Sequence, residues 1–101
     1  MKIIQDGENL NISEVKDLSS ANSESFRQEV CRSLPPTVKT IEVDLSQTRA
    51  VDSCGLGALI GVYKMATRKG DVTLRLVNPS SSLQQMFELT RLHRIFEVVQ
   101  R

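Results

Sequence analysis

The chain is poor in the residues that build most metal and redox centres. Among its 101 residues are two cysteines, Cys31 and Cys54, and a single histidine, His93. The cysteines are not spaced as CxxC and no histidines cluster with them, so the sequence has no metal-binding framework. Thiols without a disulfide pattern are typical of a reducing cytosol, and we expect neither a metal nor a cofactor.

Long apolar runs and an excess of one charge are also missing. Thirteen Lys and Arg against twelve Asp and Glu give a net charge of +1, which indicates neither a nucleic-acid surface nor a polybasic membrane anchor. No apolar run is long enough to cross a bilayer, and residues 1–13 are too polar for a signal peptide. We therefore expect a cytoplasmic protein without membrane insertion and without a nucleic-acid partner.

What the sequence does contain is an alternation of strand and helix patterns. Strand patterns occupy both sides of Asp6-Gly7 in residues 2–15 and recur in residues 38–48, 71–81 and 95–100. Helix patterns occupy residues 18–36, the segment from Val51 to about Gly70, and residues 80–96. The pattern predicts one α/β domain over residues 1–101, with a mixed sheet of four to five strands packed against three to four helices. Helical crossovers make the later strand pairs parallel.

The stretch RAVDSCGLGALIG, residues 49–61, places Asp52, Ser53 and Cys54 where the second helix begins. Asp and Ser are favoured N-cap residues, so a purely structural explanation of Ser53 is available. Alternatively, the helix dipole and the free amides of Cys54, Gly55 and Leu56 would accommodate a phosphate on Ser53. A phosphoserine adds nearly two negative charges, and the site would then act as a switch.

Catalytic and nucleotide-binding motifs are absent from this stretch. The nucleophile elbow GxSxG is replaced by Val51-Asp52-Ser53-Cys54-Gly55, and neither GxxxxGK[ST] nor GxGxxG occurs. His93 lies between two arginines in TRLHRIF, and Cys54 is expected to be a packed, inert thiol. We expect no catalytic residues and therefore no enzyme.

The second helix has two apolar faces. Leu56, Leu59, Ile60 and Tyr63 recur at the i, i+3, i+4, i+7 spacing, which predicts that they face the sheet.

The other apolar face falls roughly opposite, on Ala58, Val62 and Met65. Exposed small residues with one methionine can serve as a docking strip, although such residues are also tolerated singly on any surface. Gly57 and Gly61 lie on a flank beside Ser53, and each costs roughly 1 kcal/mol against alanine inside a helix.

Several of these motifs together resemble the STAS domain family and, within it, the bacterial anti-sigma factor antagonists. The motifs are a strand ending in Asp44-Leu45-Ser46, the segment Asp52-Ser53-Cys54-Gly55-Leu56-Gly57 opening a helix, the turn Asn78-Pro79, and the run from Leu83 to Leu92. The resemblance spans essentially the whole chain, and the segment from Asp52 to Gly57 is its most specific part.

The resemblance implies a partner-switching function with phosphorylation on Ser53. The unphosphorylated protein would bind an anti-sigma factor that is also a serine kinase, which frees a sigma factor. Phosphorylation would break that complex, and a metal-dependent serine phosphatase would restore it. The expected partner-binding residues are Asp52, Ser53, Cys54, Gly55, Leu56, Gly57, Ala58, Gly61, Val62, Met65, Ser19 and Ser20.

One position departs from the family pattern. Many members have an acidic residue after the strand that precedes the first helix, and Ser19 stands there in Lys16-Asp17-Leu18-Ser19. We expect this departure to affect recognition by the kinase or the phosphatase more than binding of the partner. A second reading is a constitutive STAS subunit of a lipid-transport ATPase, or a scaffold in a stress-sensing assembly, using the same surface without a kinase cycle.

Overall fold

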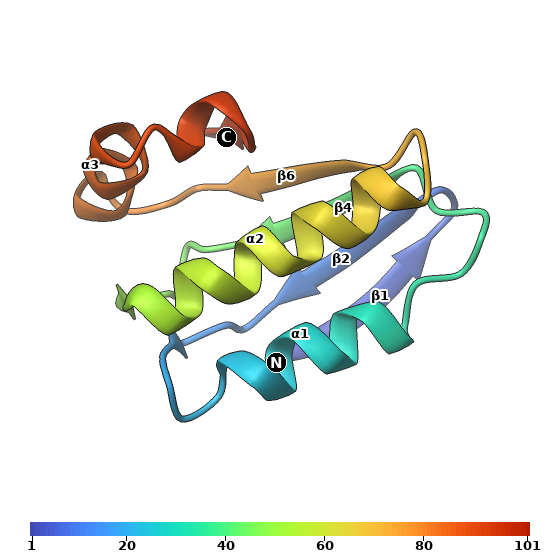
Figure 1. Ribbon diagram of the computed structural model, residues 1–101, viewed down its shortest axis with the longest axis horizontal. Helices are drawn as coiled ribbons and strands as arrows, with labels where there is room; N and C mark the ends of the chain where they lie inside the picture. Colours follow the sequence, from blue (N-terminus) through green and yellow to red (C-terminus); the bar gives the residue numbers. More distant parts are fainter.

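Two helices lie over one face of a mixed β-sheet (Figure 1). The computed structural model describes residues 1–101 and contains a five-stranded sheet in the order β1-β2-β4-β6-β7 and a two-stranded sheet of β3 and β5. The elements are β1 (Lys2–Asp6), β2 (Asn9–Ser13), β3 (Asp17–Leu18), α1 (Ser23–Arg32), β4 (Thr40–Asp44), β5 (Ala50–Val51), α2 (Ser53–Arg68), β6 (Thr73–Val77), α3 (Ser81–Leu89), the 3-10 helix η1 (Leu92–Arg94) and β7 (Glu97–Val99).

The strand pairing follows the chain connections. Strands β1 and β2 form an antiparallel hairpin whose turn contains Gly7 with a φ of +61°, a conformation that glycine adopts without strain. The pairs β2–β4, β4–β6 and β6–β7 are parallel, because each connection crosses over through a helix. The single α/β domain with a mixed sheet is confirmed.

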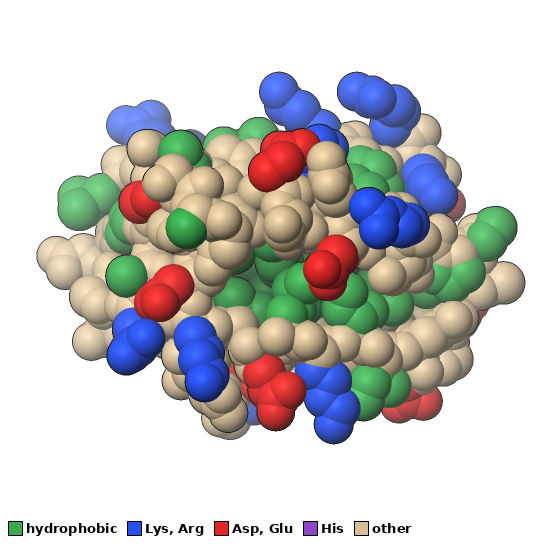
Figure 2. Space-filling view, turned by 90° about the horizontal axis from the view of Figure 1, so that it is seen from below, with side chains coloured by type: hydrophobic (Ala, Val, Ile, Leu, Met, Phe, Trp, Pro, Cys, Tyr) green, Lys and Arg blue, Asp and Glu red, His purple; other side chains and the backbone are tan.

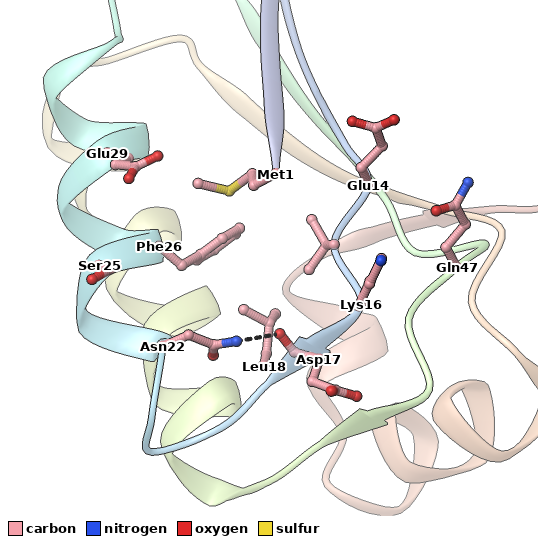
Figure 3. A pocket seen from close by; sticks show the side chains of 11 residues that line it. Met1, Glu14, Lys16, Asp17, Leu18, Asn22, Ser25, Phe26, Glu29 and Gln47 are labelled. Atoms are coloured by element: carbon pink, nitrogen blue, oxygen red, sulfur yellow. Dashed lines mark hydrogen bonds between the residues drawn. The ribbon is translucent and has the colours of Figure 1, made fainter.

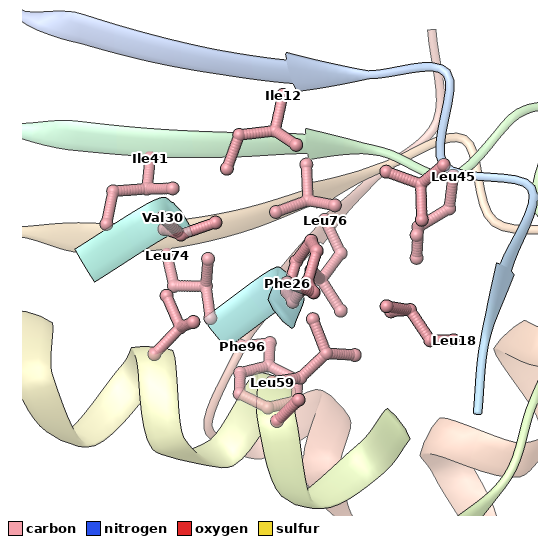
Figure 4. Packing of buried hydrophobic residues seen from close by; sticks show 14 of the residues in the cluster. Ile12, Leu18, Phe26, Val30, Ile41, Leu45, Leu59, Leu74, Leu76 and Phe96 are labelled. Atoms are coloured by element: carbon pink, nitrogen blue, oxygen red, sulfur yellow. The ribbon is translucent and has the colours of Figure 1, made fainter. Parts of the chain in front are cut away.

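The hydrophobic core lies between the sheet and the two helices that cover it (Figure 4). Alternate residues of each central strand point toward the helices, and Ile41, Val43 and Leu45 are fully buried as their spacing predicts. Helix α1 contributes Phe26 and Val30 from successive turns. This packing fixes how α2 crosses the sheet and therefore where its first turn lies.

The opposite face of the sheet carries a row of polar side chains. The strand register places Asn11, Glu42, Arg75 and Glu97 side by side across four strands. Glu42 is only 8% exposed, and its carboxylate lies 2.6 Å from an Arg101 guanidinium nitrogen and 3.8 Å from one of Arg75. The two arginines compensate the charge of the buried Glu42 carboxylate. The row as a whole keeps this face of the sheet polar.

The third helix is shorter than the sequence pattern over residues 80–96 predicts. Helix α3 ends at Leu89 because Arg91 adopts a left-handed conformation with a φ of +61°, and η1 follows. The turn brings Phe96 edge-on against Phe87 and Tyr63. Thr90 is exposed. Aromatic packing here outweighs continuation of the helix.

Candidate functional site

The first turn of α2 is held in place by the side chain of Asp52. Its Oδ1 accepts a hydrogen bond from the Gly55 amide at 2.9 Å, which makes Asp52 the N-cap of the helix. Its Oδ2 accepts a second hydrogen bond, at 3.1 Å, from the Ser20 amide in the loop between β3 and α1. The Asp52 amide in turn donates to the Leu18 carbonyl at 3.0 Å. One residue therefore ties the helix to a loop 32 positions earlier.

These hydrogen bonds stabilise the ionised carboxylate. The backbone N–H of Gly55 lowers the pKa of Asp52 below its usual range; partial desolvation opposes this effect, and the N–H groups of Ser20 and Cys54 add to it. A permanent negative charge therefore stands directly beside Ser53.

Ser53 is the first residue of α2, and it is exposed. The capping oxygen comes from Asp52, so Ser53 takes no part in the cap. The purely structural explanation of Ser53 as a capping residue is thus wrong, and its hydroxyl faces solvent.

The amides expected to hold a phosphate are mostly engaged. The Gly55 amide donates to the Asp52 side chain, and the Leu56 amide donates to the Asp52 carbonyl at 2.9 Å. The three-amide cradle is therefore not present, and a phosphate on Ser53 would lie in solvent beside the Asp52 carboxylate.

Gly55 and Gly57 have different structural roles. A Cβ added at Gly55 would lie 2.3 Å from the Leu18 carbonyl oxygen, whereas one added at Gly57 would meet nothing within 4 Å. Gly55 lets α2 pack directly on the backbone of β3, and it is buried rather than available to a partner. Gly57 leaves an open, exposed patch one turn from Ser53.

The predicted orientation of α2 is only partly correct: Leu59 is fully buried as its spacing predicts, but the expected outer strip is not exposed. Ala58 and Val62, expected on an outer docking strip, are buried at 5% and 0% exposure, and Met65 is half-buried against the core. The buried arc is centred on Leu59, Val62 and Ala66 instead. Helix α1 packs against the side of α2 that carries Ala58 and Val62. The buried arc of α2 therefore includes the side that faces α1.

The opposite flank of α2 is also less buried than expected. Leu56, Ile60 and Tyr63, expected to face the sheet, are half-buried. Gly61, by contrast, is half-buried on the side facing α1, where an added Cβ would lie 2.9 Å from the Arg27 side chain. Helical periodicity alone does not show which of two apolar arcs of a helix is buried, because that depends on where the neighbouring helix packs.

The exposed residues that remain around Ser53 form a compact patch. We define the Ser53 patch as Ser20, Asp52, Ser53, Cys54 and Gly57, all of which are exposed. The expected packing of Cys54 is wrong, because its thiol is free and exposed. The side chains of the patch are mostly small and all are exposed, which suits contact with another macromolecule better than enclosure of a small molecule.

Ser19 lies at the edge of this patch, half-buried in the turn before α1. Its amide donates to the Asn22 side chain at 2.9 Å, and its hydroxyl accepts from the Ala21 amide at 3.3 Å. The nearby Asp17 carboxylate lies 3.4 Å from the Arg49 guanidinium. Asp17 is therefore paired with Arg49, and Ser19 itself shapes the turn that Asp52 holds.

Hydrophobic periodicity did not predict β3 or β5, the strands that support the patch, and only the family resemblance placed a strand just before Ser19. Each has two residues, with Asp17 paired to Ala50 and Leu18 to Val51. Segments this short carry no detectable period. The only available signal was Gly55, a buried glycine in a helix, which indicates a close backbone approach.

A hollow of about 810 Å³ opens beside the same loop. Figure 3 shows its floor of Phe26 and Leu18 and the carboxylates of Glu14 and Glu29 around it. Seen from this side of the molecule, hydrophobic side chains gather in a recess between charged ones (Figure 2). The walls of the hollow come from segments far apart in the chain, so no local pattern in the sequence predicts it.

The remaining chemical groups form no second centre. No group of three or more His, Cys, Asp and Glu side chains is placed to hold a metal ion. His93 is exposed on η1, with its Nδ1 3.4 Å from the Phe87 carbonyl oxygen. None of the three α-helices has the length and apolar character needed to span a bilayer.

Solved structures with this fold include two determinations of a Thermotoga maritima protein, TM1081, and one of SpoIIAA. The crystal structure of TM1081, a proposed anti-sigma factor antagonist, has a TM-score of 0.89 and 22% identity, covering 99% of this chain and 86% of that one. Its NMR structure gives 0.82 and 23%, with coverages of 95% and 77%. The anti-sigma factor antagonist SpoIIAA, in its unphosphorylated form, gives 0.71 and 20%, with coverages of 87% and 81%.

At these identities the structural likeness establishes the fold. The sequence model of the STAS domain family matches residues 2–101, which is nearly the whole chain. The chain therefore belongs to the STAS domain family.

Proposed function

We propose that this protein is a cytoplasmic anti-sigma factor antagonist that works by partner switching. In its unphosphorylated form it binds an anti-sigma factor with serine kinase activity through the Ser53 patch and thereby releases a sigma factor. Phosphorylation of Ser53 blocks that binding, and a metal-dependent serine phosphatase reverses the block. The protein has no catalytic role of its own. Membership of the STAS family and its likeness to SpoIIAA and TM1081 support this assignment.

The observation that carries the proposal is the position of the Ser53 hydroxyl. It is exposed at the first residue of a 16-residue helix whose cap is supplied by the neighbouring Asp52. A kinase can therefore reach the hydroxyl without unfolding the helix, and a phosphate there breaks no hydrogen bond of the cap.

The switch acts through charge on the docking surface. A phosphate adds about −1.5 to −2 at neutral pH, directly beside the Asp52 carboxylate, whose lowered pKa keeps it ionised. Two negative groups side by side repel an acidic partner surface, and their desolvation raises the cost of docking an apolar one. Binding is lost while the fold is retained.

The test is affinity capture from the native cell extract with Ser53→Ala and Ser53→Asp as paired baits. We expect the Ala form to retain an ATP-binding, kinase-like protein that the Asp form loses. Ser81 provides a matched control, because it is exposed at the first residue of α3 behind the capping Ser80. Ser81→Ala and Ser81→Asp should both capture like wild type.

The constitutive STAS subunit predicts a different result. Both Ser53 baits would then retain the same transporter or scaffold proteins, because no kinase cycle acts on the patch. Equal capture by the Ala and Asp forms would contradict the partner switch.

A further inference from the structure

The first strand of the sheet is an uncovered edge. Strand β1 pairs only with β2, through five consecutive residue pairs, and is the lowest strand of the sheet in Figure 1. It contains no proline, glycine or bulge, and Ile4 is 47% exposed. Natural proteins usually interrupt or cover such an edge because its free N–H and C=O groups can pair with another chain.

The hairpin geometry determines which backbone groups are free. Asp6 and Asn9 flank the two-residue turn Gly7-Glu8 and form its hydrogen-bonded pair. Because the direction of these groups alternates along an antiparallel strand, Asp6, Ile4 and Lys2 point toward β2. The N–H and C=O groups of Ile3 and Gln5 therefore point outward from the sheet.

The side chains of β1 are self-complementary about Ile4. If a second copy pairs antiparallel with the register centred on Ile4, Ile3 lies opposite Gln5 of the second copy, and the outward backbone groups meet as hydrogen-bonded pairs. Lys2 then lies opposite Asp6 of the second copy, at both ends of the contact. Registers shifted by two residues keep the hydrogen-bond pattern but place Ile4 opposite a charged side chain instead.

We propose that two copies of this chain form a two-fold dimer by antiparallel pairing of their β1 strands. Four backbone hydrogen bonds, an Ile4–Ile4 contact on the axis and two Lys2–Asp6 ion pairs join the copies into one continuous sheet. Such an isologous contact is closed and does not propagate into fibres. The strands of the two copies run in opposite directions. The two Ser53 patches, which lie beyond the carboxyl ends of the central strands, therefore lie at opposite ends of the dimer. The dimer is independent of the proposed partner switch and leaves both patches accessible.

Charge reversal tests the register. Alone, Lys2→Asp places Asp opposite Asp6, and Asp6→Lys places Lys opposite Lys2, so each variant should dimerise at least about tenfold more weakly than wild type. Mixed in equal amounts, the two variants regain opposite charges at both ends and should form a heterodimer. Sedimentation equilibrium from micromolar to millimolar concentration measures all three cases.

A backbone variant tests the strand pairing itself. Gln5→Pro removes an N–H that points to the free edge, and proline is tolerated on edge strands at such positions. It should make the protein monomeric, whereas the matched control Gln5→Ala should still dimerise. A wild-type chain that stays monomeric at millimolar concentration overturns the proposal, and so does a dimer that neither Gln5→Pro nor charge reversal weakens.

Discussion

The carboxylate of Asp52 joins two parts of the chain that are 32 residues apart, by accepting a hydrogen bond from the Ser20 amide at 3.1 Å. The same side chain caps α2 through the Gly55 amide. The loop before α1 and the first turn of α2 are therefore held as one surface, with the Ser53 hydroxyl exposed on it.

Stability should depend on pH through Asp52. Its folded-state pKa is lowered by the hydrogen bonds from Gly55, Ser20 and Cys54, so its contribution is present above the unfolded-state pKa of about 3.9 and is lost as the pH falls through the lower folded-state pKa. In urea unfolding, the advantage of wild type over Asp52→Asn should therefore be largest near neutral pH and should shrink below about pH 4. A difference that is constant across this range would show that the carboxylate is not preferentially ionised in the folded state.

Ser53→Ala should change the free energy of unfolding by less than about 0.5 kcal/mol, because the hydroxyl is exposed and takes no part in the cap. The Asp form should also remain folded, with an unchanged circular dichroism spectrum. Urea unfolding of both variants beside wild type measures this. A larger loss in Ser53→Ala would assign the serine a structural role and weaken the interpretation of the capture experiment.

Alanine substitutions of Gly55 and Gly57, in the first two turns of α2, should change the free energy of unfolding in opposite directions. Gly55→Ala places a Cβ 2.3 Å from the Leu18 carbonyl oxygen and should destabilise the fold by about 1–3 kcal/mol through overpacking. Gly57→Ala meets nothing within 4 Å and should stabilise the helix by about 0.5–1 kcal/mol.

Gly57→Ala also tests the Ser53 patch. Because it preserves the fold, reduced capture of the partner in the Ser53→Ala background would place Gly57 in the contact. Unchanged capture would show that the partner does not pack on this turn.

The orientation of α2 can be tested with two leucines. Leu59 is fully buried, whereas Leu56 is half-buried on the flank. Leu59→Ala should lower the free energy of unfolding by about 2–5 kcal/mol, and Leu56→Ala by much less. Equal losses would favour the orientation that the sequence spacing alone predicts, in which both leucines face the sheet.

The hydrophobic spacing along the chain was sufficient to predict the α/β class, the hairpin at Asp6-Gly7 and the parallel order of the later strands. These features depend on local periods and on the length of each connection, both of which are written in consecutive residues. The motif from Asp52 to Gly57 pointed to the correct family for the same reason, because it is contiguous.

The details of the site depended on contacts between distant segments. Ser20 meets Asp52, and Leu18 meets Gly55, only after β3 and β5 have paired. The burial of Ala58 and Val62 depends on α1 packing beside α2, which no spacing within α2 encodes. The sequence alone thus determined which elements form, whereas the tertiary structure decided which face of α2 is buried and which oxygen caps it, because both depend on neighbours contributed by other parts of the chain.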